Sequence, residues 1–143
     1  MRTIFKTAFT IQSDTRYLAV LRAWVLAASK IAGRKNFPKI AIVPCTLALI
    51  EAVDNAIFHA HDRKRQLPID LEMVVRHGSI VIVVGDLGVG IGHHGVIKPD
   101  EMEDHGRGLF LIHKLMSRVD SGFKNEKHFI RMIYKHERSK FVS

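Results

Sequence analysis

Three polar side chains recur at intervals of four in the stretch Glu51–Ala60: Glu51, Asn55 and His59. On an α-helix, residues four apart stand along one edge, so a carboxylate, a carboxamide and an imidazole could serve a single site. The residues around them are mostly apolar, which predicts a largely buried helix in which polar groups need partners. A solvated polar stripe is the commoner outcome when such a pattern stands alone.

Two glycine clusters follow further along the chain. The first, Asp86-x-Gly88-x-Gly90-Ile91, directly continues the apolar run Ile80–Val84. Asp86 would therefore end a buried strand, where its carboxylate must find donors, and an exocyclic amino group is a suitable one. The glycines let the backbone turn sharply or pass close to a flat ligand. A glycine-rich hairpin turn capped by Asp86 explains this cluster equally well.

The second cluster, Gly106-Arg107-Gly108-Leu109, opens a predicted helix. Free N–H groups and the helix dipole favour anions at such a position, so it could seat a phosphate. A plain helix start is the alternative. No Gly-Lys-Ser/Thr sequence occurs in the chain, which argues against a Walker loop, and the first cluster does not open a helix as a dinucleotide fingerprint would.

The elements that must position these residues follow from periodicity and from turn residues. Alternating apolar residues predict strands, and apolar residues at helical spacing predict helices, one of which stops at Gly33. The predicted strands are residues 2–11, 69–76, 80–84, 119–123 and 129–134, and the predicted helices are residues 18–32, 44–60 and one starting near 108. The order β-α-α-β-β-α-β-β predicts an α+β fold: a two-layer sandwich with a mixed, mostly antiparallel sheet and helices on one face.

Length and composition favour one ordinary domain over residues 1–143, with 47% apolar and 25% charged residues. The formal net charge is +8, and the basic surplus lies at both ends of the chain: residues 1–40 hold eight Lys and Arg against one acidic residue. Such a charge could attract nucleic acid or an acidic protein, or could simply keep the protein soluble. Nucleic acid is the weaker hypothesis because it depends on charge alone.

The single cysteine, Cys45, excludes an internal disulfide and fits a reducing compartment. No signal-like leader opens the chain, and the apolar runs are shorter than the roughly 20 residues that a membrane span needs. We therefore expect a soluble cytoplasmic protein that does not bind a membrane.

Taken together and in order, Glu51-x-x-x-Asn55, Asp86-x-Gly88-x-Gly90-Ile91 and Gly106-x-Gly108 resemble the N, G1 and G2 boxes of the GHKL ATPases, which have the Bergerat fold. The compact chain looks most like the bacterial anti-sigma-factor serine/threonine kinases of the RsbW and SpoIIAB type. The resemblance implies binding of ATP or ADP with Mg²⁺.

The resemblance also implies roles for individual residues. Asn55 would bind Mg²⁺ through the nucleotide, Glu51 would be the catalytic base, and Asp86 would accept a hydrogen bond from the adenine amino group. The remaining matched positions would shape the nucleotide pocket or wrap the phosphates: Gly88, Gly90, Ile91, Gly106, Arg107, Gly108 and Leu109. The loop from His93 to His105 would form a lid, and the role of His59 stays open.

The implied activity is phosphorylation of Ser or Thr on a small anti-sigma-antagonist protein, with a sigma factor as a second partner. A homodimer is one assembly open to the chain, and the sequence does not decide the oligomeric state. Relatives carry a Gly-Thr pair near the start of the last strand, where this chain has Lys127-His128-Phe129. That departure leaves a second hypothesis open: a nucleotide-gated protein-binding module with little or no phosphotransfer.

Overall fold

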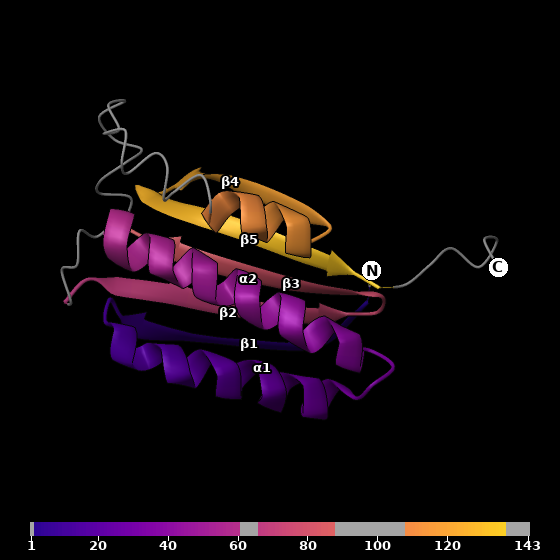
Figure 1. Cartoon of the computed structure of the whole chain (residues 1–143). Helices are drawn as coiled ribbons and strands as arrows, with labels where there is room; N and C mark the ends of the chain where they lie inside the picture. The colour runs from indigo at the N-terminus through magenta and orange to yellow at the C-terminus, as the bar shows by residue number, and fades with distance from the viewer. Residues whose placement is uncertain (1, 61–65, 88–107, 137–143) are drawn as a thin grey trace.

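A five-stranded sheet forms one layer of the molecule and helices form the other (Figure 1). The computed structural model describes residues 2–60, 66–87 and 108–136. The strands lie in the order β1-β2-β3-β5-β4, and each neighbouring pair is antiparallel. Their bounds are β1 Thr3–Gln12, β2 Pro68–Arg76, β3 Ser79–Asp86, β4 Arg118–Lys124 and β5 Lys127–Lys135. The predicted α+β sandwich is confirmed, and its described strands are antiparallel throughout.

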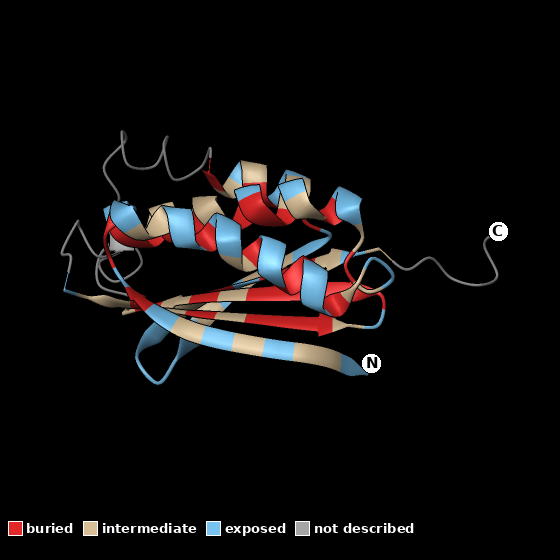
Figure 2. Ribbon diagram, turned by 90° about the horizontal axis from the view of Figure 1, so that it is seen from below, coloured by how far each residue is buried: buried red, intermediate tan, exposed pale blue. Residues whose placement is uncertain are grey.

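The described helices all lie on the same face of this sheet, and none of them covers the other face, called the helix-free face below (Figure 2). Gly33, with a φ of 81°, ends the first helix, and its N–H donates to Ser29 O. The second helix begins at Ile42, two residues before the predicted start, after a short 3₁₀ turn. The helical elements are η1 Thr15–Tyr17, α1 Leu18–Ala32, η2 Lys39–Ala41, α2 Ile42–Asn55, the π-helical turn η3 Ala56–Ala60, and an unlabelled helix at residues 108–115.

The main core fills the space between the two layers. Alternate residues of the strands point toward the helices, as in Met73 and Ile82, while α1 and α2 contribute residues such as Leu21 and Leu49 at helical spacing. Cys45 is fully buried in this core, and burial raises the pKa of its thiol to about 12. The residue is therefore a core side chain and not a nucleophile.

Helix α2 belongs to one stretch, Lys39–Phe58, that is long and apolar enough to cross a membrane by length and composition. This finding corrects the expectation that every apolar run is too short. Half of the stretch is buried inside the molecule, where α2 packs against β3 and β5. The core helix of a soluble protein passes the same test.

Candidate functional site

Two of the three residues in the predicted polar row lie on the last turns of α2. Glu51 and Asn55 are both partly exposed, and Asn55 is the last residue of the helix. His59 instead belongs to the π-helical turn Ala56–Ala60. Since a π-helical turn takes more residues than an α-helical one, the α-helical geometry behind the predicted row holds from Glu51 to Asn55 and ends there.

A glycine from the third helix lies directly against this pair. A Cβ atom placed on Gly108 would stand 3.2 Å from Asn55 Oδ1 and 3.2 Å from Glu51 Oε2. That is tighter than an ordinary van der Waals contact, so a side chain at this position would press on both polar groups. The sheet-covering helices therefore bring the end of α2 and the start of helix 108–115 together. Leu109, the next residue, packs against the main core and anchors the helix start.

Asp54, which the sequence pattern did not single out, lies on α2 close enough to Glu51 to feel its charge. Its Oδ1 atom is buried and has no hydrogen-bond partner among the described residues. Burial raises the pKa of the Asp54 carboxyl, and the nearby Glu51 carboxylate raises it further. The signal was present in the sequence, because Asp54 stands three positions after Glu51 and thus on a neighbouring position of the same helix face.

Asp86 lies where the apolar run predicts it, at the last position of β3, and its side chain is buried. In the pairing of β3 with β5 it stands directly opposite His128. His128 Nδ1 lies 3.2 Å from Asp86 Oδ2. The structure thus supplies a donor for this carboxylate that the sequence did not predict.

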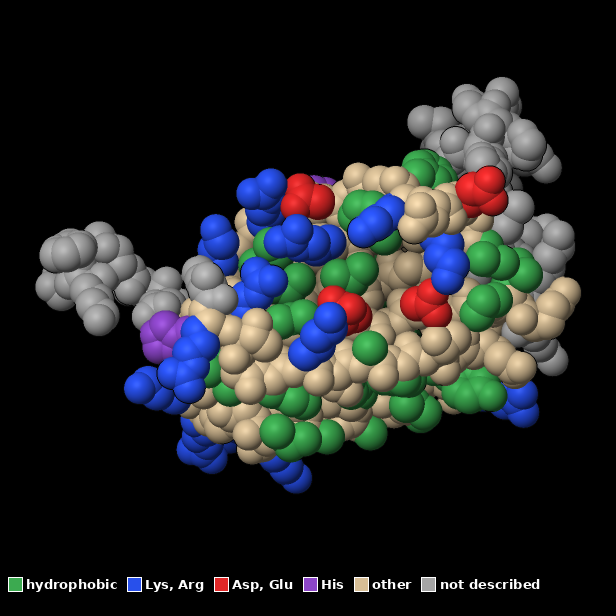
Figure 3. All heavy atoms as spheres, turned by 180° about the vertical axis from the view of Figure 1, so that it is seen from behind, with side chains coloured by type: hydrophobic (Ala, Val, Ile, Leu, Met, Phe, Trp, Pro, Cys, Tyr) green, Lys and Arg blue, Asp and Glu red, His purple; other side chains and the backbone are tan. Residues whose placement is uncertain are grey.

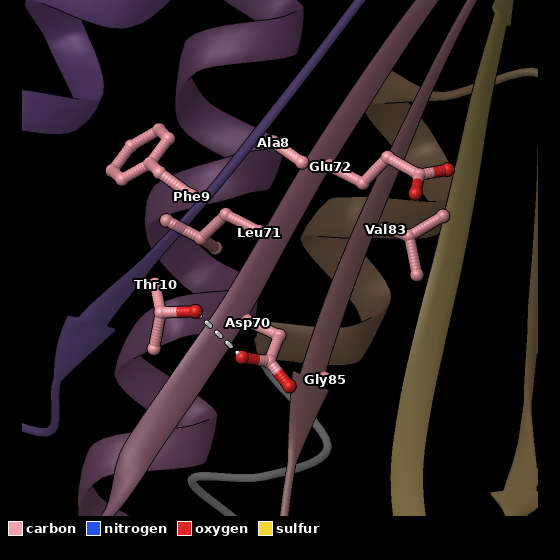
Figure 4. A pocket seen from close by; sticks show the side chains of 8 residues that line it. All are labelled: Ala8, Phe9, Thr10, Asp70, Leu71, Glu72, Val83 and Gly85. Atoms are coloured by element: carbon pink, nitrogen blue, oxygen red, sulfur yellow. Dashed lines mark hydrogen bonds between the residues drawn. The ribbon is translucent and has the colours of Figure 1, made fainter.

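The helix-free face of the sheet carries a separate open hollow of about 430 Å³. Two small residues, Ala8 and Gly85, leave room for it, as Figure 4 shows. Both of its acidic residues are already engaged: Asp70 accepts from Thr10 Oγ1 at 2.8 Å and from Lys127 Nζ at 2.9 Å, and Glu72 pairs with Lys6 at 3.6 Å. The hollow lies on the face opposite the helices, away from Glu51 and Asn55, so it is not part of the candidate site.

The remaining predicted site residues lie outside the described part of the chain. They are Gly88, Gly90, Ile91, Gly106 and Arg107, together with the predicted lid from His93 to His105. Within residues 2–60, 66–87 and 108–136, no three His, Cys, Asp or Glu side chains are grouped to hold a metal by themselves. Asn55, which is partly exposed, fits a different arrangement, in which Mg²⁺ takes one protein oxygen and completes its shell with phosphate oxygens and water.

Comparison with known proteins agrees with this geometry. The family described as the histidine kinase-like ATPase domain matches residues 11–134. A solved structure of the RsbU and RsbW domains of Rv1364c from Mycobacterium tuberculosis is similar in fold, with a TM-score of 0.65 and 15% identity. The similarity covers 94% of this chain and 33% of that one, so this chain spans about a third of the length of that protein. No curated protein sequence matches the chain. Because the family match extends over most of its length, the chain belongs to the histidine kinase-like ATPase family.

Proposed function

We propose that this protein binds Mg²⁺-ATP among α2, the end of β3 and the start of helix 108–115, and acts as a cytoplasmic anti-sigma regulatory kinase. The observation that carries the proposal is the approach of Gly108 to Glu51 and Asn55, because it joins two sequence motifs across the fold. Family membership supports a nucleotide as the ligand.

Each described residue then has a role that its environment supports. Asn55 would offer its amide oxygen to Mg²⁺, which neutralises phosphate charge when it is bound. Glu51, partly exposed at the same place, would take the proton from the attacking hydroxyl group. Gly108 would allow the phosphates to approach the helix start closely, since it has no side chain. Asp86 would accept a hydrogen bond from the adenine amino group.

The proposed substrate is a Ser or Thr hydroxyl on a small antagonist protein, and the proposed second partner is a sigma factor. An RsbW domain in the similar structure supports this choice of regulatory system. The surface of α1 and of the connection to α2 supports an acidic partner, because residues 15–50 contain six Lys and Arg and no Asp or Glu. All six basic residues are exposed.

A groove of about 350 Å³ lies within that basic surface, and we call it the α1–α2 groove. Its apolar lining includes Leu26, Phe37 and Ile42. Exposed cations lie around it: Lys30, Arg34 and Lys39. The groove has an apolar lining, and the charged residues around it are all basic. It therefore favours a partner segment that combines aliphatic and acidic side chains.

A nucleotide-gated binding module without phosphotransfer is the second candidate. The contact between His128 and Asp86 favours it, since the resembled kinases carry Gly-Thr where this chain has Lys127-His128-Phe129. A pocket that has His128 in place of the Gly-Thr pair could still bind the nucleotide base and yet transfer phosphate inefficiently.

Two substitutions separate chemistry from binding. Glu51→Gln keeps the shape and removes the basic oxygen, so phosphotransfer from labelled ATP should fall about 10²–10⁴-fold with nucleotide affinity nearly unchanged. Asn55→Ala removes the Mg²⁺ ligand, so calorimetry should show that affinity and its dependence on Mg²⁺ are lost together. If the unmodified protein binds no nucleotide with Mg²⁺ present, the proposal is wrong. If it binds ATP and changes its partner affinity without transferring phosphate, the binding module is correct.

A further inference from the structure

A side chain from β5 contacts the buried carboxylate at the end of β3. Asp86 and His128 are register partners, and His128 Nδ1 lies 3.2 Å from Asp86 Oδ2. The Asp86 side chain is 6% exposed, whereas that of His128 is 32% exposed. A partly exposed imidazole therefore contacts a carboxylate that is almost fully buried.

The chemistry of the pair decides which atom donates. An ionised carboxylate can only accept hydrogen bonds, so His128 Nδ1 must carry the hydrogen. A carboxylate offers about four acceptor positions, and the bond from His128 uses one of them on Oδ2. The bond from His128 thus fixes one oxygen of Asp86, and a carboxylate held in this way can still accept from a further donor.

Neighbouring contacts hold His128 in this position. The preceding residue, Lys127, points to the other face of the sheet, where its Nζ lies 2.9 Å from Asp70 Oδ2 on β2. The lysine reaches Asp70 across β3 at Gly85, which has no side chain to block it. On the helix side, the Phe123 ring lies 5.2 Å from the His128 ring. The start of β5 is therefore tied to the sheet on both faces.

We propose that His128 is a positioning residue that holds Asp86 as an acceptor for the nucleotide base, and thereby favours a 6-aminopurine over a 6-oxopurine. The inference depends on the proposed function, because it assigns Asp86 to the base. A 6-aminopurine presents an N–H donor to Asp86, whereas a 6-oxopurine presents an oxygen there and its nearest donor is the ring N1–H. A carboxylate released at Oδ2 could shift toward N1–H, but one that is bonded to His128 would first have to break that bond.

The test compares ATP with inosine triphosphate, both with Mg²⁺, by calorimetry on the full chain. His128→Leu removes the donor and should weaken ATP binding about tenfold while it lowers the ratio of ATP to inosine triphosphate affinity by a similar factor. His128→Asn places an amide N–H near the position of Nδ1 and should retain the ratio within about threefold of the original. His113→Leu, at an exposed position on helix 108–115, is the matched control and should change neither affinity.

Three results would overturn the inference. His128→Leu could weaken both nucleotides equally, which is what a merely structural residue would do. His128→Asn could match His128→Leu, in which case the donor at Nδ1 is irrelevant. The ratio could also stay unchanged in every variant. If His128→Leu melts near the assay temperature, His128→Gln, whose amide lies nearer to the position of Nε2, replaces it and should also lower the ratio. Failure of the unmodified protein to bind either nucleotide would refute the proposed function itself, and is thus distinguishable from these outcomes.

Discussion

Asp54 and Asp70 are aspartates whose environments shift their pKa values in opposite directions. Burial and the Glu51 carboxylate raise the pKa of Asp54, so the folded protein holds a proton there more tightly than the unfolded chain does. The hydrogen bond from Lys127 lowers the pKa of Asp70; burial raises it in part, while the bond from Thr10 and the charge of Lys127 lower it further. At neutral pH the ionised carboxylate of Asp54, on the helix side of the sheet, therefore lowers the stability of the folded protein. The ionised carboxylate of Asp70, on the helix-free face, raises it.

We predict opposite effects of the same substitution at these two positions. The stabilisation from a protonated Asp54 is fully present below the unfolded pKa of 3.8 and is lost as the pH rises through the folded value. Asp54→Asn should therefore raise the melting temperature at pH 7, by about 2–4 °C, and give no gain at pH 3. Asp70 contributes stability above its unfolded pKa that is lost as the pH falls through the lower folded value, so Asp70→Asn should lower the melting temperature more at pH 7 than at pH 3. Shifts of the same sign at pH 7 in thermal denaturation would contradict both assignments.

Among the elements, the hairpin of β4 and β5 contains the least favourable local backbone. Its two loop residues are Asn125 and Glu126, with φ values of 52° and 66°. A two-residue loop with positive φ at both positions is typical of a type I′ turn, whose twist matches that of the flanking strands. Asparagine tolerates this region, but glutamate pays a steric cost in it. The cost is placed directly before Lys127 and His128, which start β5.

Glu126→Gly should therefore stabilise the protein. Glycine adopts positive φ freely, so the free energy of unfolding in urea should rise by about 0.5–1 kcal/mol. Asn125→Gly is the matched control and should give a smaller gain in the free energy of unfolding, because asparagine adopts positive φ at a lower steric cost than glutamate. A loss of stability in Glu126→Gly would mean that the glutamate side chain makes a compensating interaction.

At the same scale, the sequence predicted what depends on local spacing. Alternation and helical periodicity located β1, α1, the hairpin of β2 and β3 and the place of Asp86, because each reflects which face of one element is buried. The three ordered motifs placed Glu51, Asn55 and Gly108 in one implied nucleotide site, and the contact of Gly108 with the other two became visible only in the structure. The π-helical turn was not predictable, since the α-helical pattern continues through Ala56–Ala60 without a visible interruption. Nor was the bond between His128 and Asp86, because the register of β5 against β3 is set only when the whole sheet forms.

At the scale of the whole molecule, the positive charge is distributed differently on the two faces. On the helix-free face, Asp and Glu side chains lie among the Lys and Arg side chains (Figure 3). Ion pairs there join Lys6 to Glu72 at 3.6 Å, Lys127 to Asp70 at 2.9 Å and Arg118 to Asp120 at 3.1 Å. The α1–α2 groove has no acidic residue in its stretch of chain to balance Lys30, Arg34 and Lys39. The groove should therefore dominate the attraction of an acidic partner.

The last prediction tests where that partner binds. Reversing the groove charges with Lys30→Glu, Arg34→Glu and Lys39→Glu should weaken binding of the antagonist or sigma factor at least about tenfold, and mainly through a slower association rate. The control reverses three exposed cations of the β4–β5 side, Lys124, Arg131 and Lys135, for the same change in net charge. It should leave affinity within about threefold. The groove set should not alter ATP affinity, since the groove and Asn55 lie at opposite ends of α2, which by helical rise is about 20 Å long. Biolayer interferometry with purified candidate partners at two salt concentrations would measure the affinity and the association rate of each variant. Equal weakening by both sets would show that the overall positive field, rather than the groove, attracts the partner.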